Sequence, residues 1–308
     1  TTTGTNVGIK TTNNDTEAQS NTVTVTKTGS ITTGTGNNAY GIFNDGAYNT
    51  TTVSGSITTA GFFANGIRND GNYNKTTLSG SITTSNDTYA YGIYNLGDSN
   101  TTTVSGSITT GTGNSAHGII NIGSNNTTTV SGSIATTGSG AVGINNQGSN
   151  NTTTVSGSIK TTGDDGYGIA IYNSSNTTTV SGSIVTTGSA AHGIVHAGDP
   201  SPNTTTISGT VKATGASSAA LSNFSGSGNS FTLDEGAIII GDIIAAEYGA
   251  FSIGITNSKL IFNLGASTSY AYSVSGKGEG TGAGQWIFSD LDRSSQVVTT
   301  TGTGCDTT

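Results

Sequence analysis

Asn100-Thr-Thr-Thr-Val-Ser-Gly-Ser-Ile108 is one copy of a segment that recurs through most of the 308-residue chain. Its second half, Val-Ser-Gly-Ser-Ile, occurs five times unchanged and three times in a closely related form. The glycines at the centre of these copies are Gly29, Gly55, Gly80, Gly106, Gly132, Gly157, Gly182 and Gly209. Neighbouring glycines are 25 to 27 residues apart, and a fixed period of this length is typical of repeat proteins.

A second motif, Gly-Ile-x-Asn-x-Gly, keeps step with the first one. It occurs at 41–46, 66–71, 92–97 and 118–123, and a related copy lies at 143–148. Each period therefore contains short segments rich in β-branched residues, and Gly and Asn turn residues separate them. The period is too short for a propeller blade and shows no helical pattern, so we predict stacked β coils.

Side chains alternate between the two faces of a strand, which divides the segment 100–108 into an inner and an outer set. The inner set is Thr102, Val104, Gly106 and Ile108, with the glycine leaving room where the coil is narrow. The outer set is Thr101, Thr103, Ser105 and Ser107. The sequence thus predicts an all-β parallel β-helix (β-solenoid) with one coil per 25–27 residues and two or three strands per coil. Nine such coils, about 4.8 Å apart, would make a rod roughly 40–45 Å long.

Stacking of the coils predicts that equivalent residues form rows along the rod. We expect an inward ladder of hydrogen-bonded amides, because asparagines form such ladders in stacked sheets. Its members are Asn44, Asn69, Asn95, Asn121 and Asn146. We also expect a row of flat rings on the surface. Its members are Tyr40, Tyr91, His117, Tyr167 and His192.

The distribution of the motifs predicts four parts of the chain. Residues 1–32 form an irregular N-terminal coil, and 33–223 form the solenoid repeats. The more hydrophobic stretch 224–295 is expected to add further coils and a cap, because a solenoid needs an end that differs from its interior. Residues 296–308 are expected to be a polar linker, in which Cys305 is the one cysteine of the chain.

Three segments near the end resemble a known family. They are Thr232-Leu-Asp-Glu-Gly-Ala-Ile-Ile-Ile-Gly-Asp-Ile243, Leu260-Ile-Phe-Asn-Leu-Gly265, and the stretch that begins Tyr272-Ser-Val-Ser-Gly276 and ends Gly284-Gln-Trp-Ile-Phe-Ser-Asp-Leu291. They are similar to the C-terminal end of the passenger domains of autotransporters, the type V secretion proteins of Gram-negative bacteria. The resemblance implies a right-handed β-helix on the outside of the cell. It also implies that the chain's own outer-membrane barrel lies downstream of residue 308.

Composition narrows the classes of partner. The formal net charge is −8, and nine Lys and Arg residues lie scattered along the chain. Nucleic-acid binding needs a basic patch, so we expect no nucleic-acid partner. No apolar run of eighteen residues occurs that could cross a membrane as a helix.

Parallel β-helices often carry polysaccharide lyases and hydrolases, which need grouped carboxylates, or a carboxylate with Arg or Lys, held on one face. Asp45 and Asp70 align in neighbouring coils, but each lies in Asn-Asp-Gly, which is an ordinary turn sequence. Other candidates, which lack an evident basic partner or replace ladder residues, are Asp164, Asp165, Asp234, Glu235, His117, His192 and His196. We expect no enzyme activity, no cofactor and no metal.

The outward hydroxyl rows form the candidate surface-binding site. They consist of Thr103, Ser105, Ser107, Thr129, Ser131, Ser133, Thr154, Ser156 and Ser158. Ice-binding solenoids carry Thr-x-Thr arrays of a similar kind, whereas the simplest explanation is that Thr favours strands and keeps an exposed sheet hydrated.

We therefore expect a non-enzymatic, adhesin-like rod on the surface of a Gram-negative bacterium, which contacts surface ligands or neighbouring cells. One alternative is a solenoid that binds ice or another crystal surface through its Thr and Ser rows. A second alternative is a carbohydrate-active β-helix enzyme. Side-to-side self-association is compatible with long exposed sheets.

Overall fold

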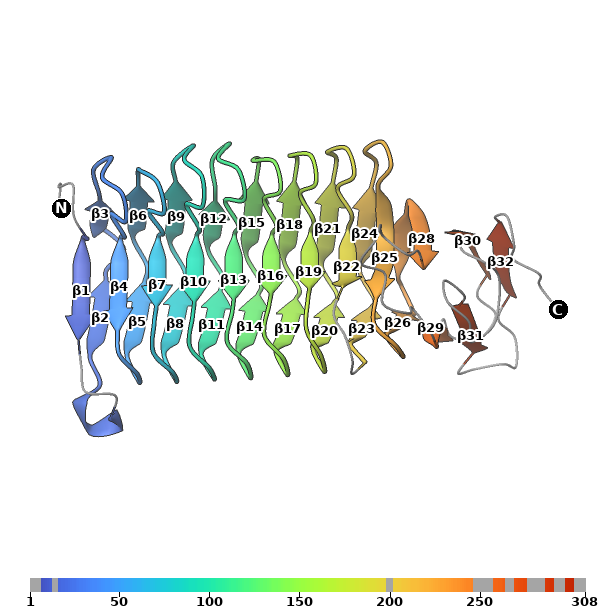
Figure 1. The fold of residues 1–308 in the computed structure, drawn as a ribbon, viewed down its shortest axis with the longest axis horizontal. Coiled ribbons are helices and arrows are strands. Elements are labelled where there is room, and N and C mark those ends of the chain that lie inside the picture. The colour runs from blue at the N-terminus through green and yellow to red at the C-terminus, as the bar shows by residue number, and fades with distance from the viewer. Residues whose placement is uncertain are drawn as a thin grey trace.

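The computed structural model of the chain describes residues 7–12, 16–197, 202–245, 257–263, 269–275, 286–290 and 297–301. It confirms the predicted fold, an all-β solenoid of about nine turns with about 26 residues in each. Figure 1 shows the strands of each sheet following one another along the rod, from β1 (Ile9–Thr12) near one end to β32 (Val297–Thr301) near the other. A short 3-10 helix, η1 (Glu17–Gln19), lies in the first coil.

Each regular coil gives one strand to each of three parallel sheets. Sheet A contains β1, β4 (Ile42–Asp45), β7 (Ile67–Asn69), β10 (Ile93–Asn95), β13 (Ile119–Asn121), β16 (Ile144–Asn146), β19 (Ile169–Ile171), β22 (Ile194–Ala197), β25 (Ala219–Ser225), β28 (Asp242–Ala245), β30 (Ser269–Ser275) and β32. Sheet B contains β2 (Thr22–Val25), β5 (Thr50–Val53), β8 (Lys75–Leu78), β11 (Thr101–Val104), β14 (Thr127–Val130), β17 (Thr152–Val155), β20 (Thr177–Val180), β23 (Thr204–Ile207), β26 (Ser230–Asp234), β29 (Ser258–Asn263) and β31 (Trp286–Asp290). Sheet C contains β3 (Ser30–Thr32), β6 (Ser56–Thr59), β9 (Ser81–Thr84), β12 (Ser107–Thr109), β15 (Ser133–Thr136), β18 (Ser158–Thr161), β21 (Ser183–Thr186), β24 (Thr210–Ala213) and β27 (Ile238–Ile240).

Strands of neighbouring coils pair residue for residue through the repeats. Val104 lies between Leu78 and Val130 in sheet B. At the adjoining corner, the Ser133 N–H donates to the carbonyl of Gly106 over 2.9 Å. Equivalent residues of successive coils therefore lie directly over one another, as the period predicts.

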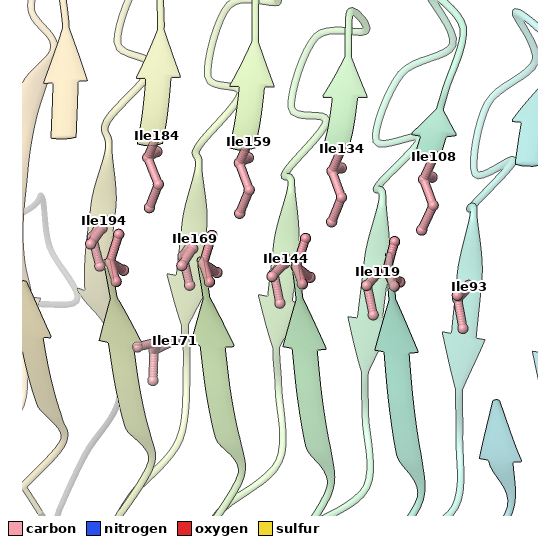
Figure 2. Packing of buried hydrophobic residues seen from close by; sticks show 14 of the residues in the cluster. Ile93, Ile108, Ile119, Ile134, Ile144, Ile159, Ile169, Ile171, Ile184 and Ile194 are labelled. Atoms are coloured by element: carbon pink, nitrogen blue, oxygen red, sulfur yellow. The ribbon is translucent and has the colours of Figure 1, made fainter. Parts of the chain in front are cut away.

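The interior is a narrow column of aliphatic side chains contributed by all three sheets. Figure 2 shows two of its rows, which are Ile108, Ile134, Ile159 and Ile184, and Ile93, Ile119, Ile144, Ile169 and Ile194. Each isoleucine packs against its copies above and below, so a coil buries its few apolar residues only when it is stacked. A chain with 31% hydrophobic residues can fill such a core because the core is thin.

The prediction that residues 100–108 form one strand with an inward Gly106 is wrong. β11 ends at Val104 and β12 begins at Ser107 in a different sheet, so the chain turns a corner between them. A Cβ atom on Gly106 would lie 1.9 Å from the carbonyl oxygen of Gly80 in the coil below. Glycine is therefore required at this corner because the backbones of successive coils stack there without room for a side chain.

An inner asparagine ladder runs through the first five repeats. The side-chain amide Nδ2 of Asn95 donates to Oδ1 of Asn121 over 2.8 Å and to the hydroxyl of Thr102 in its own coil over 3.1 Å. The same pair of bonds recurs down the row formed by Asn44, Asn69, Asn95 and Asn121. Both amide protons are thus used inside the core, and this satisfies polar groups that would otherwise be costly to bury.

The inner ladder ends where the sequence changes. Ile171 follows Asn146 in register, and His196 and Asn223 follow Ile171. The hydroxyl of Thr178, which would accept a bond from an asparagine at 171, is buried without a hydrogen-bond partner. His196 restores the bond in the next coil through Nε2, which lies 2.8 Å from the hydroxyl of Thr205.

A second ladder of asparagines, which sequence reasoning did not identify, lines the corner between sheets A and B. The backbone N–H of Asn100 donates to Oδ1 of Asn126 over 2.7 Å, and the Asn100 amide donates to the carbonyl of Gly97 over 2.7 Å. The members of this corner ladder are Asn21, Asn49, Asn74, Asn100, Asn126, Asn151, Asn176, Asn203 and Asn229. These side chains hold the backbone of each turn to the coil that follows it.

The three sheets include strands from both ends of the chain. Residues 9–32 already supply one strand to each sheet, β1, β2 and β3. β26, β27, β28 and β29 continue the same three sheets beyond residue 224. β32 pairs with β30, so residues 297–301 of the predicted linker form a strand, as their two β-branched valines favour. Cys305 lies outside the described residues.

Replacing Gly106 with Ala should lower the free energy of unfolding, because the new methyl group would collide with the backbone of Gly80. We expect a loss of roughly 1–3 kcal/mol, as for other overpacking changes. Denaturant unfolding followed by circular dichroism measures it. Gly29→Ala is the matched control, because its Cβ would meet atoms no closer than 3.1 Å in the first coil. Equal losses in the two variants would contradict the stacking argument.

Candidate binding faces

The predicted hydroxyl rows do not form one flat face. Thr103 lies on β11 in sheet B, Ser105 lies exposed at the corner, and Ser107 begins β12 in sheet C. The same division holds for Thr129, Ser131 and Ser133, and for Thr154, Ser156 and Ser158. The structure therefore brings the three threonines together on one sheet and places the two serines of each coil around a corner.

The serine corners form a long, shallow groove of about 880 Å³ along the rod. It runs from Lys27 to Ser158 and is lined by the Ser-Gly-Ser segments of successive coils. Its lining combines the backbone of stacked glycines with serine side chains, so hydrogen-bonding groups recur along its length.

The outer surface of sheet B is a regular array of threonines, which we call the threonine face. Its sixteen outward positions on the eight strands from β2 to β23 hold fifteen threonines and Lys75. The threonines are Thr22, Thr24, Thr50, Thr52, Thr77, Thr101, Thr103, Thr127, Thr129, Thr152, Thr154, Thr177, Thr179, Thr204 and Thr206. Parallel in-register pairing places them in two straight rows.

Sheet C provides a comparison within the same molecule. The outward positions equivalent to Thr109 on its later strands hold Ala135, Lys160, Val185 and Lys212. The preference of strands for threonine acts equally on both sheets. That preference alone does not explain why sheet B keeps threonine while sheet C loses it.

Sheet A carries a different surface over the early coils, which we call the aromatic face. It consists of Tyr40, Phe43, Tyr48, Phe62, Phe63, Arg68, Tyr73, Tyr89, Tyr91 and Tyr94. The sequence signal for it was available, because nine aromatic residues occur between 40 and 94 and none between 95 and 166.

Arg68 is the centre of the aromatic face. Its guanidinium carbon lies 5.1 Å from the ring centre of Tyr40 and 5.2 Å from that of Tyr94. It donates two hydrogen bonds to the carboxylate of Asp70, at 2.6 and 2.8 Å, and one to the Tyr40 hydroxyl at 2.7 Å. Burial lowers the pKa of Arg68, but the hydrogen bond and charge of Asp70 outweigh it, and the pKa lies above its ordinary value.

The predicted surface row of rings is largely buried, so that prediction is wrong in part. Tyr40 is 6% exposed and His117 is 7% exposed, and Tyr91 and His192 are also buried, while Tyr167 is partly exposed. The cause is the turn that precedes each strand of sheet A, which folds these rings over the outer side of that sheet. The ring of Tyr91, for example, lies 5.5 Å from that of Tyr94.

Burial in the fold keeps the three histidines neutral. His117 Nδ1 accepts the Val142 N–H at 3.0 Å, so the neutral ring carries its proton on Nε2. His192 Nδ1 likewise faces the Ala219 N–H at 2.9 Å. Burial lowers the pKa of His117 and of His192 to about 4 and that of His196 to about 3.

Four of the carboxylates considered for catalysis have structural partners. Asp45 pairs with Lys10 at 2.8 Å, and Asp70 pairs with Arg68. Asp164 accepts the Ser189 N–H at 2.8 Å, and Asp234 accepts the Asn263 amide at 2.9 Å. Within the described ranges, no group of three or more His, Cys, Asp or Glu side chains is placed to hold a metal ion. None of the helices found there is long and apolar enough to cross a membrane.

Comparison with models of protein families, with curated proteins and with solved structures gave no match. The class of the protein therefore follows from its architecture. It is a β-solenoid repeat protein with three parallel sheets. Its two distinctive surfaces are the threonine face and the aromatic face.

Acidification should destabilise the fold through the buried histidines. In the unfolded chain they bind protons near pH 6.5, whereas in the fold they resist protonation down to about pH 4 or pH 3. The unfolded state thus holds more protons between these values, so the free energy of unfolding falls as the pH drops from about 6.5 to 4. For His117 alone the loss should reach up to about 3 kcal/mol. Urea unfolding at pH 7.0, 5.5 and 4.5 measures it.

The control for the pH experiment is a triple variant in which each histidine is replaced by the residue that another coil has at the equivalent position. The substitutions are His117→Tyr and His192→Tyr, which copy Tyr91 and Tyr167, and His196→Asn, which copies Asn223. The triple variant should lose most of the dependence between pH 6.5 and 4. An unchanged dependence would assign it to the carboxylates instead.

Proposed function

We propose that this chain is a non-enzymatic, adhesin-like rod, displayed on the surface of a Gram-negative bacterium as the passenger domain of an autotransporter. The observation that carries the proposal is the continuity of the sheets into the segment that resembles passenger ends. β26, β29 and β31 add in parallel to the strands of the repeats, and they contain or adjoin the three resembling segments. The repeats and the segments that resemble passenger ends thus belong to the same stack of strands.

The charge of the chain narrows the partners of the proposed rod. The net charge of −8 disfavours nucleic acid as a partner. Ligands on other cells or surfaces are the partners that a long, repetitive, hydrated rod contacts best, through many weak bonds that act together.

Surface display is testable with antibodies raised against the purified chain. They should label intact cells of the bacterium that produces it, and brief treatment of those cells with a protease should remove the label. An antibody against a periplasmic protein serves as the control and should label permeabilised cells only. Labelling of the rod that also requires permeabilisation would rule out display.

A second candidate function is binding to ice or another crystal surface through the threonine face. The observation that favours it is the fifteen threonines in sixteen outward positions, against the mixed residues of sheet C. The methyl and hydroxyl groups of threonine together match a lattice of ordered water, and parallel coils repeat them about every 4.8 Å. Residue-for-residue pairing between coils repeats this arrangement from one coil to the next.

The threonine face predicts thermal hysteresis, a gap between the melting and freezing points of a solution of the chain. Thr103→Lys and Thr129→Lys, at the middle of the array, should each abolish most of that gap. Thr109→Lys is the control, because it adds the same charge on sheet C, where Lys160 already occupies an equivalent position. Absence of hysteresis in the unmodified protein would remove this candidate.

A further inference from the structure

The aromatic face contains bulky residues in a backbone conformation that they rarely adopt. Tyr48, Phe63, Tyr73 and Tyr89 have φ values of 60°, 55°, 57° and 58°. This left-handed region favours Gly and Asn, and a large aromatic residue there is strained. Strain of this kind is found at functional sites more often than elsewhere.

Equivalent turns in later coils use small or polar residues. The turn of Tyr48 and Tyr73 has Ser99, Asn125 and Asn150 in the next three coils, at the same positive φ. The turn of Phe63 and Tyr89 continues with Ser115 and Gly140. The fold therefore does not need aromatic residues at these turns, and their presence in the early coils requires a reason other than folding.

The strained rings form two stacked pairs with an exposed ring at the end of each. Tyr48 and Tyr73 stack with their ring centres 4.9 Å apart, and Phe63 and Tyr89 stack at 4.8 Å. Tyr73 is 53% exposed and Tyr89 is 36% exposed. The coil that follows each pair presents a serine at the turn, so no further ring continues either stack.

Each stacked pair borders a small hollow. Tyr48 and Tyr73 line a pocket of about 380 Å³ with Asp45 and Asp70. Phe63 and Tyr89 line a pocket of about 230 Å³ with Arg68, Tyr94 and Gln147. The Arg68–Asp70 ion pair joins the two hollows, because Arg68 lines one of them and Asp70 lines the other.

The chemistry of the hollows selects the class of ligand. The faces of the rings suit the apolar C–H faces of pyranose sugars, whose hydrogens carry a slight positive charge. The amide of Gln147, the tyrosine hydroxyls and the Arg68 N–H groups not engaged by Asp70 or Tyr40 can bind sugar hydroxyls. The charges of Arg68 and Asp70 cancel locally, as do those of Lys10 and Asp45, which favours a neutral ligand over an ionic one.

A small ligand fits the dimensions better than a folded protein. The two hollows are close to the lower end of small-molecule sites, roughly 300 Å³ and above. A stable protein interface would need about 800 Å² of surface on each partner. We propose that the aromatic face binds a neutral oligosaccharide, with a sugar ring packed against Tyr73 and another against Tyr89. This inference names a ligand class for the adhesin-like rod and rests on the proposed function in that respect.

The experiment measures binding of the purified chain to neutral hexasaccharides by titration calorimetry. The probes are the hexamers of β-1,4-glucose, β-1,4-N-acetylglucosamine, α-1,4-glucose and β-1,4-mannose. We expect at least one to bind, with an affinity that does not fall with added salt, because a neutral ligand is not screened. Failure of all four hexamers to bind, or binding that salt abolishes, would overturn the inference.

The variants Tyr73→Ser and Tyr89→Ser separate a binding role from a structural one. Serine already occupies the next coil at both turns, so the unfolding midpoint should stay the same or rise as strain is relieved. The affinity for the hexamer should fall by about tenfold or more in each variant, because a stacked ring is lost. Tyr172→Ser is the control, since Tyr172 is 38% exposed in a later coil, and its affinity should not change.

Unchanged affinity in Tyr73→Ser and Tyr89→Ser would overturn the inference even if the chain binds sugar. The result is independent of where the protein is displayed, since calorimetry uses the purified chain. Surface labelling without sugar binding would leave the proposed rod in place and remove this site. Sugar binding by a chain that is not displayed would keep this site and remove the proposed surface rod.

Discussion

Parallel, in-register hydrogen bonding between coils is the constraint on which the rest of this structure depends. Because each residue pairs with its own copy one coil away, every position along the chain becomes a row along the rod. Polar residues can then occupy the core where the stack supplies their partners, as the inner asparagines bond both to their own copies and to a threonine of the same coil. At the Ser-Gly-Ser corner the backbones of successive coils lie too close together for side chains, so the stacked residues are glycines.

The same constraint explains which features could be read from the sequence. The period, the coil stack and the inward row of asparagines follow from spacing alone, because equal spacing becomes vertical alignment. The corner at Ser105 and Gly106 could not be seen, because Val104 and Ile108 keep the same inward parity on both sides of it. Alternation continues across the corner and hides the change of sheet. The buried position of Tyr40 was missed since it depends on how a turn folds over a neighbouring sheet.

Repetition also makes departures from the pattern informative. A residue that differs from its own copies, while the backbone around it stays the same, is free of the demands of folding at that point. Tyr73 stands where later coils have Ser99 and Asn125, and it accepts a backbone conformation that they adopt more easily. Sheet B shows the opposite, because it retains threonine outside the core where sheet C varies. In both cases the fold alone does not explain the residue, so its surface role does.

The corner ladder has a consequence for producing this protein. Seven members of the corner ladder begin Asn-x-Thr triplets, the acceptor sequence for N-linked sugars in eukaryotic secretory pathways: Asn49, Asn74, Asn100, Asn126, Asn151, Asn176 and Asn203. The side chains of these seven residues are at most 1% exposed. Oδ1 of Asn100, for example, accepts the Asn74 N–H of the preceding coil and its Nδ2 donates to Gly97 in its own turn, so the folded rod shields them. An enzyme that reaches the chain before it folds would attach a bulky group at each turn and keep successive coils apart. Secretion from yeast or animal cells should therefore yield misfolded chains where a bacterial host yields rods.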